Sequence, residues 1–95
     1  MDTPRKIVLH SLGGSRSNLP ALVTAWIAQG VGYVGVVGED AAAIEDEIDW
    51  LCIGDGKNSY FMLTAAHASG ETLQDAIQLA EQISTVAGTV AVVEL

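Results

Sequence analysis

Residues 6–20 read Lys-Ile-Val-Leu-His-Ser-Leu-Gly-Gly-Ser-Arg-Ser-Asn-Leu-Pro, and this stretch decides the fold class. Its first six residues are a short, mostly apolar run followed by a Gly-Gly pair, which predicts a buried strand. Either Ser17 or Asn18 can then cap a helix that tolerates Pro20 in its first turn and stops at Gly30. A strand, a glycine-rich loop and a helix in this order predict a βα unit.

The same unit recurs along the rest of the chain. Three further apolar runs predict strands, at residues 33–38, 60–64 and 89–93. Asp40 is placed to cap a second helix, and a third is predicted over residues 71–86 with Gly88 as the glycine that follows its end. The strands recur roughly every 27 residues, the length that one strand, one loop and one helix require. The predicted element order is therefore βαβαβαβ.

Strands this uniformly apolar are buried on both faces, which is typical of a parallel sheet with helices on each side. We therefore expect residues 1–95 to form a single three-layer α/β domain of the Rossmann-like or flavodoxin-like type, with four parallel strands. The preferred strand order is 2-1-3-4, and the alternative is 3-2-1-4. The last strand would be an open edge in the preferred order, so homodimerisation is possible.

Composition narrows the class of partner. The chain has 95 residues and a formal net charge of −8, from 12 acidic and 4 basic residues. This charge repels nucleic-acid phosphates and anionic membranes, whereas a basic protein remains a possible partner. Cys52 is the single cysteine, so no internal disulfide can form. No apolar stretch resembles a signal or membrane-spanning segment, and a cytoplasmic location is the simplest expectation.

Ligands of such folds bind outside the carboxyl ends of the strands. The candidate ligand-binding residues that the predicted strands bring to this edge are His10, Ser11, Gly13, Gly14, Asp40, His67 and Glu71. Two histidines with carboxylates can bind a metal or act as acid and base, although each residue also has a purely structural explanation. The Gly13-Gly14 loop, with Arg16, can receive a phosphate or carboxylate, but it matches no nucleotide-binding motif. No cofactor is predicted, and whether a metal binds is left open.

Two other groups of residues have a possible role. Ser11, His67 and Asp40 can be drawn as a nucleophile, a base and an acid, although their spacing does not require it. The second predicted helix has a strongly acidic outer face beside a tryptophan, which is either a solvated surface or a docking site for a basic partner. The candidate partner-binding residues are Glu45, Asp46, Asp49 and Trp50.

Two resemblances bear on function. Residues 7–15 resemble the oxyanion-loop segment of α/β-hydrolases, but the chain has no Gly-x-Ser-x-Gly motif and is too short for that fold. Residues 31–83 are similar to a family of short bacterial proteins of unknown function. That similarity rests on Val-Val-Gly-Glu-Asp at residues 36–40 and on Leu-Thr-Ala-Ala-His at residues 63–67, with acidic residues and a Gly-Asp-Gly turn between them. It implies a small stand-alone domain and assigns no activity.

The preferred interpretation is a non-enzymatic binding or interaction domain, because size and charge suit one and no complete catalytic set is present. The alternative is a small-molecule or metal-dependent enzyme, hydrolase-like, that acts at the carboxyl edge of the sheet. Whether the protein is an enzyme is left open by the sequence.

Overall fold

The computed structural model describes residues 4–54, 56–57 and 59–95. The predicted βαβαβαβ order is confirmed. The elements are β1 (Lys6–Ser11), α1 (Leu19–Gln29), β2 (Tyr33–Gly38), α2 (Ala41–Ile53), β3 (Leu63–Ala66), α3 (Leu73–Gln82) and β4 (Val90–Glu94).

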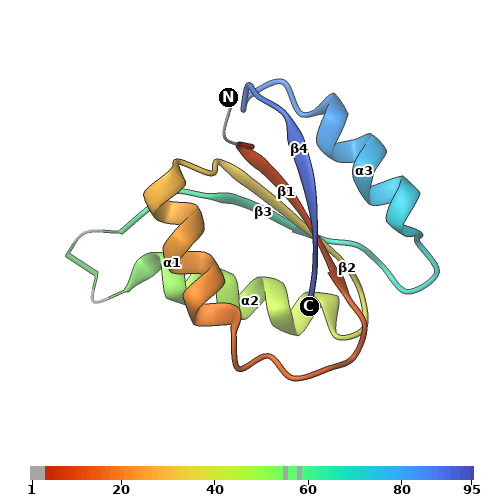
Figure 1. Ribbon diagram of the computed structural model, residues 1–95, viewed down its shortest axis with the longest axis horizontal. Helices are drawn as coiled ribbons and strands as arrows, with labels where there is room; N and C mark the ends of the chain where they lie inside the picture. Colours follow the sequence, from red (N-terminus) through yellow and green to blue (C-terminus); the bar gives the residue numbers. More distant parts are fainter. Residues whose placement is uncertain (1–3, 55, 58) are drawn as a thin grey trace.

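The four strands form one parallel sheet in the order β3-β2-β1-β4. The preferred order 2-1-3-4 is therefore wrong, and the alternative 3-2-1-4 is confirmed. Both crossovers from β1 to β2 and from β2 to β3 step in the same direction, so right-handed connections put α1 and α2 on one face of the sheet. The third crossover returns past both central strands to β4, which places α3 on the opposite face (Figure 1).

Each face of the sheet has its own core. The larger core fills the space between the sheet and the pair α1 and α2, and its fully buried members include Leu9, Leu19, Val34, Ile44 and Ile48. The smaller core lies under α3 and consists of Val8, Tyr33, Val37, Ala76 and Ala80. The central strands β1 and β2 are almost wholly buried, whereas the edge strands β3 and β4 are partly exposed.

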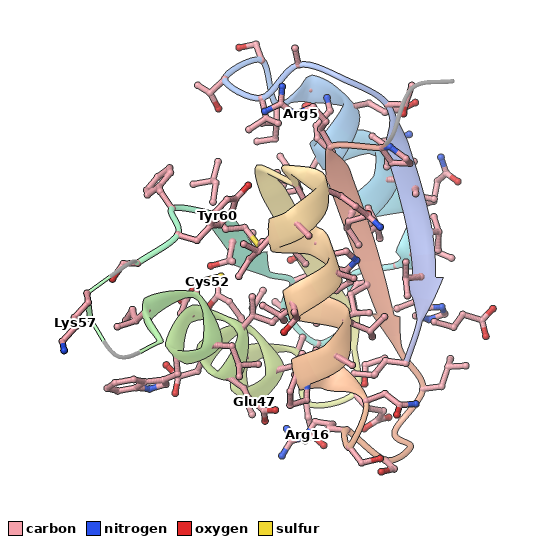
Figure 2. All side chains as sticks on the ribbon, turned by 60° about the vertical axis from the view of Figure 1, so that its left-hand side comes forward. Arg5, Arg16, Glu47, Cys52, Lys57 and Tyr60 are labelled. Carbon is pink, nitrogen blue, oxygen red and sulfur yellow. The ribbon has the colours of Figure 1, made fainter. Side chains whose placement is uncertain are left out.

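The third strand begins later than predicted because the residues before it are held by other partners. Tyr60 donates its backbone N–H to Cys52 O at 2.9 Å and its hydroxyl to Val31 O at 2.6 Å. These bonds tie residue 60 to the end of α2 and to the start of β2 (Figure 2). The ladder with β2 therefore starts only at Leu63.

The third helix is shorter than predicted at both ends. Thr72 caps it, so it starts at Leu73, and Ile83 is already extended at its end. The Ile83 carbonyl accepts a hydrogen bond from Lys6 Nζ at 3.2 Å, which ties the helix end to β1. Gly88 is thus not the glycine that ends the helix, and it instead packs beside Arg5.

The chain end at residue 95 continues the β1–β4 ladder. Leu95 N donates to His10 O at 2.9 Å, and Leu12 N donates to Leu95 O at 3.1 Å. These bonds fix the last residue beside the carboxyl end of β1. Within the residues that the structure describes, no helix has the length and apolarity needed to cross a bilayer.

Candidate functional site

A cavity of about 830 Å³ lies at the carboxyl edge of the sheet, where ligands of doubly wound folds bind. Three segments line it: residues 10–12 at the end of β1, residues 38–43 from the end of β2 to the first turn of α2, and residues 67–71 after β3. Five of the predicted ligand-binding residues are on its wall, namely His10, Ser11, Asp40, His67 and Glu71. The structure thus brings most of the candidate set to one cavity.

The other two candidates, Gly13 and Gly14, are not among the lining residues. Gly13 has a left-handed φ of 83°, and a Cβ built on it would lie 3.4 Å from Glu39 Cγ. Its role is to let the loop pass close behind Glu39. Gly14 has no atom within 4 Å of an added Cβ, so it lies in open space.

The sharp turn from β2 into α2 shapes the centre of the cavity wall. Gly38 has φ of 105°, and a side chain there would collide with the Ser11 carbonyl oxygen. Asp40 follows in the left-handed region at φ 55°. It occupies the predicted N-cap position, but its side chain makes no capping hydrogen bond, so the first amides of α2 have no side-chain acceptor.

Both histidines stand in one row across the sheet. His10 on β1 pairs with Val37 on β2, and on the other side His67 N donates to Val36 O at 2.8 Å. Side chains alternate along a strand, so His10 follows Val8 onto the face that α3 covers, and His67 likewise follows Ala65. The two imidazoles therefore flank Val37 on the same face of the sheet.

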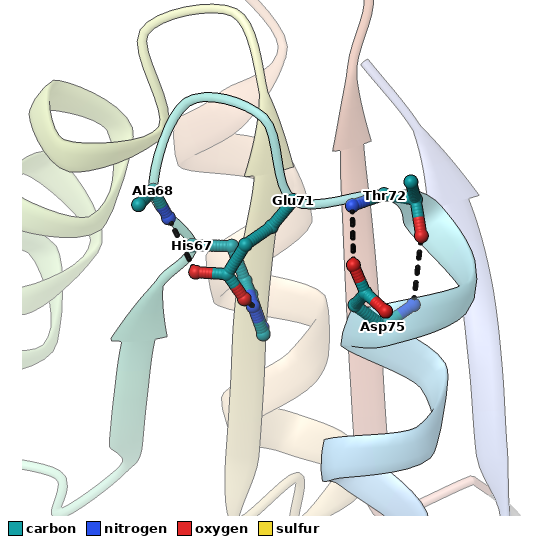
Figure 3. A network of polar contacts seen from close by, with 5 residues as sticks. All are labelled: His67, Ala68, Glu71, Thr72 and Asp75. Carbon is teal, nitrogen blue, oxygen red and sulfur yellow. Dashed lines mark hydrogen bonds and ion pairs between the residues drawn. The ribbon is translucent and has the colours of Figure 1, made fainter.

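A hydrogen-bond network fixes the His67 imidazole (Figure 3). Its Nδ1 lies 2.9 Å from Glu71 Oε2, and the second carboxylate oxygen accepts from Ala68 N, also at 2.9 Å. The hydrogen bond to His67, followed by that to the Ala68 amide, lowers the pKa of Glu71. An ionised carboxylate can only accept, so Nδ1 carries a proton, and in the neutral imidazole Nε2 is then an acceptor.

Like Ser11, His67 is a buried polar residue of the cavity wall. Its side chain is 4% exposed, whereas that of Glu71 is 44% exposed. Nε2 is buried and has no hydrogen-bond partner among the residues that the structure describes. The sequence identified His67 as a candidate, but not the Glu71 contact that sets its tautomer.

The start of α3 holds Glu71 in place. Thr72 Oγ1 accepts from Asp75 N at 3.1 Å, and Asp75 Oδ2 accepts from Thr72 N at 2.9 Å, which together form a capping box. These hydrogen bonds lower the pKa of Asp75, and the positive charge of a protonated His67 lowers it further. The His67 imidazole is thus close enough to α3 for its charge, when protonated, to influence Asp75 in the first turn of this helix.

Several predicted combinations are not formed. The acid that orients His67 is Glu71 and not Asp40, and among the described residues no hydrogen bond joins His67 to Ser11. Residues 4–54, 56–57 and 59–95 contain no group of three histidine, cysteine, aspartate or glutamate side chains that could hold a metal ion. Arg16 lies in an exposed loop and does not line the cavity.

The predicted partner-binding residues lie on α2 in different environments. Trp50 is 66% exposed and Asp46 is exposed, whereas Glu45 is half-buried. Asp49 already accepts a hydrogen bond from Thr64 Oγ1 at 2.8 Å and so helps to join α2 to β3. The adjoining Asp55 lies outside the described residues.

Glu39 and Ser69 also line the wall, and the sequence places both at the carboxyl edge although neither is among the candidate ligand-binding residues. Each is next to a predicted element end, Glu39 directly before Asp40 and Ser69 within the loop after His67, and this position was the available signal.

Comparison with known proteins gives one family. A family model described as "Domain of unknown function (DUF7684)" matches residues 4–93, a wider range than the resemblance over residues 31–83. No curated protein and no solved structure matches the chain.

Proposed function

This chain belongs to the DUF7684 family, whose function is unknown, and we propose that it is a small non-enzymatic binding domain with its ligand in the carboxyl-edge cavity. The proposal is based on an open cavity whose wall carries histidine, serine and carboxylate side chains. It does not depend on any activity carried over from another protein.

The observation that carries the proposal is the unpartnered Nε2 of His67. A buried acceptor without a partner costs about 1–3 kcal/mol, and such groups are uncommon in native proteins. A ligand that donates to Nε2 would remove this cost, and that gain would contribute to its affinity. The Glu71 contact supports the same role because it presents Nε2 in the accepting form.

A hydrolase-like enzyme is the alternative, and the same histidine–carboxylate pair favours it, since bases in nucleophilic catalysis are oriented in this way. Ser11 and Ser69 both line the cavity, but neither hydrogen bonds to His67 among the described contacts. The pair thus has an orienting acid and a base but no engaged nucleophile. Ligand binding does not require a nucleophile, so the described residues fit a binding site better than a hydrolase active site.

The test is ligand binding followed by amide NMR, with His67→Asn as the informative variant. Asparagine keeps an N–H donor near the position of Nδ1 and removes Nε2, so the loop contact to Glu71 can persist while the acceptor is lost. The matched control is Glu81→Gln, an exposed position on α3 away from the cavity. The wild-type protein is screened against small metabolites. The proposal is supported if bound compounds shift the amide resonances of residues 10–12, 38–43 and 67–71. Their affinity should be lower for His67→Asn and unchanged for Glu81→Gln.

A test for conversion of the bound compound distinguishes a binding domain from a hydrolase-like enzyme. A bound compound that is recovered unchanged after prolonged incubation supports a binding domain. Its conversion to a product, abolished by His67→Asn, would overturn the non-enzymatic part of the proposal in favour of the hydrolase-like alternative.

We further propose that α2 docks a basic protein partner through Asp46 and Trp50. The large exposed area of Trp50 supports this, because aromatic residues are enriched at interfaces, and the negative charge of Asp46 is complementary to a basic partner. A partner recovered from native lysate by the wild-type protein, and lost on Trp50→Ala, is the expected result. Recovery that is equal for both proteins would contradict it.

We also propose that two copies can associate through an open sheet edge. Both β3 and β4 are edge strands, and Leu63 and Val92 are exposed on them. Light scattering at high micromolar concentration should give a dimer mass. A monomer mass there would refute self-association.

A further inference from the structure

The wall of the carboxyl-edge cavity carries an excess of negative charge. Glu39, Asp40 and Glu71 all line it, and the lining residues described include neither lysine nor arginine. The low pKa of Glu71 keeps that carboxylate ionised at neutral pH. Clefts lined by one sign of charge concentrate ligands of the opposite sign, so the cavity favours a cation over an anion.

The Nε2 atom of His67 favours one kind of cation, a cation that can donate a hydrogen bond. In the neutral imidazole Nε2 needs a donor, and an ammonium group offers three N–H donors and no acceptor. One ammonium can therefore bond to Nε2 and to a neighbouring carboxylate at once. A metal ion would need several ligands in fixed geometry, and the described residues offer no such group of three.

The start of α2 gives the strongest argument for an anion instead. Ala41–Ala43 line the cavity, and no side chain caps their amides. Glu39 and Asp40, however, directly precede this helix end, and their charges oppose an incoming anion. The helix end therefore does not reverse the preference for a cation.

We infer that the cavity binds a small organic amine in its protonated form, with the ammonium donating to His67 Nε2. This inference rests on the proposed ligand-binding function and specifies its ligand class. Nε2 is buried in the unliganded protein, so an amine reaches it only when the groups that cover it move aside. A cavity of about 830 Å³ accommodates an elongated polyamine as well as a single amine.

The experiment records the imidazole ¹⁵N resonances of His67 while four probes are added separately. Spermidine is the amine, triethylene glycol is a neutral chain, inorganic phosphate is the anion, and magnesium chloride is the inorganic cation. Spermidine alone should move Nε2 from the position of a free acceptor toward that of a hydrogen-bonded one. The affinity should fall with added salt.

Two cavity variants and one control accompany the titration. His67→Asn should weaken spermidine binding about tenfold, the effect of losing one hydrogen bond to a charged group. Asp40→Asn should also weaken it, and this variant keeps the proposal testable if His67→Asn does not fold. Glu81→Gln, outside the cavity, should leave the affinity unchanged.

The remaining outcomes overturn the inference in distinguishable ways. A response of Nε2 to triethylene glycol or phosphate, without one to spermidine, shows that the cavity binds another class and leaves the proposed binding function standing. An equal response to magnesium, or an equal loss in Glu81→Gln, reveals charge attraction without a site. No response to any probe, together with a failed metabolite screen, removes both proposals.

Discussion

The carboxylate of Glu71 holds His67 by the imidazole, at 2.9 Å from Nδ1, from a position four residues further along the chain. Its other oxygen binds the amide of Ala68, so a single side chain closes the loop and fixes the ring. The orientation of the imidazole at the cavity therefore depends on the charge of Glu71.

Stability should fall in acid through Glu71. Its pKa in the folded protein lies below the ordinary value of 4.5, because of its bonds to His67 and Ala68, so the unfolded chain takes up a proton first as the pH drops. The stabilising contribution is complete above pH 4.5 and is lost as the pH falls through the folded pKa. Urea unfolding of wild type and Glu71→Gln across this window should show a shallower pH dependence in the variant. Parallel curves would contradict the assignment.

Thr72→Ala should cost about 1 kcal/mol of unfolding free energy, because it removes the side-chain acceptor of the capping box. Thr85→Ala is the matched control, since Thr85 is exposed and lies outside every helix. Denaturant midpoints measured for both variants test this. An equal small effect at the two positions would show that the box contributes little.

Tyr33 and Gly35 should be energetically coupled. The Tyr33 hydroxyl is buried and has no partner in the described part of the chain, so Tyr33→Phe should leave stability unchanged or raise it by about 1 kcal/mol. A Cβ on Gly35 would lie 2.7 Å from that hydroxyl, so Gly35→Ala should cost about 1–3 kcal/mol. The cost should be smaller when Tyr33→Phe is already present, as a double-mutant cycle would measure. Gly14→Ala, in open space, is the control.

Truncation of a side chain should lower the stability of the protein on the buried side of α2 and have little effect on its exposed side. Ile48 is fully buried, and Ile48→Ala should cost about 2–5 kcal/mol. Trp50 is 66% exposed, and Trp50→Ala should change the unfolding free energy by no more than about 0.5 kcal/mol. Urea unfolding of both variants measures these values. A large loss from Trp50→Ala would mean that the indole packs in solution and is not free to meet a partner.

The first two strands were predicted residue by residue, because glycine or proline bounds each of them and both are buried on two faces. The observed strand order was only the alternative prediction, since the runs that became β3 and β4 are about as apolar as the central strands. Which run lies at the edge depends on whether the crossover through α2 or the one through α3 runs back over the sheet, a tertiary choice that local hydrophobicity does not encode.

The cavity followed from parallel topology, which brings the strand ends to one edge in either strand order. The contacts between the residues of the cavity wall could not be predicted from the topology. The spacing of His67 and Glu71 is that of residues on neighbouring helical turns, yet they meet across a loop, and only the geometry of that loop decides the contact. The same holds for Asp40, where the residue type predicted a cap but the left-handed backbone prevents the capping bond.

The bonds of Leu95 to His10 and Leu12 place the carboxyl end of the chain beside the cavity, while the start of β1 lies at the opposite end of the sheet (Figure 1). A purification tag or fusion partner attached after Leu95 would thus emerge next to the cavity entrance and compete with ligands for access. The same tag attached ahead of β1 would lie at the opposite end of the sheet from that entrance.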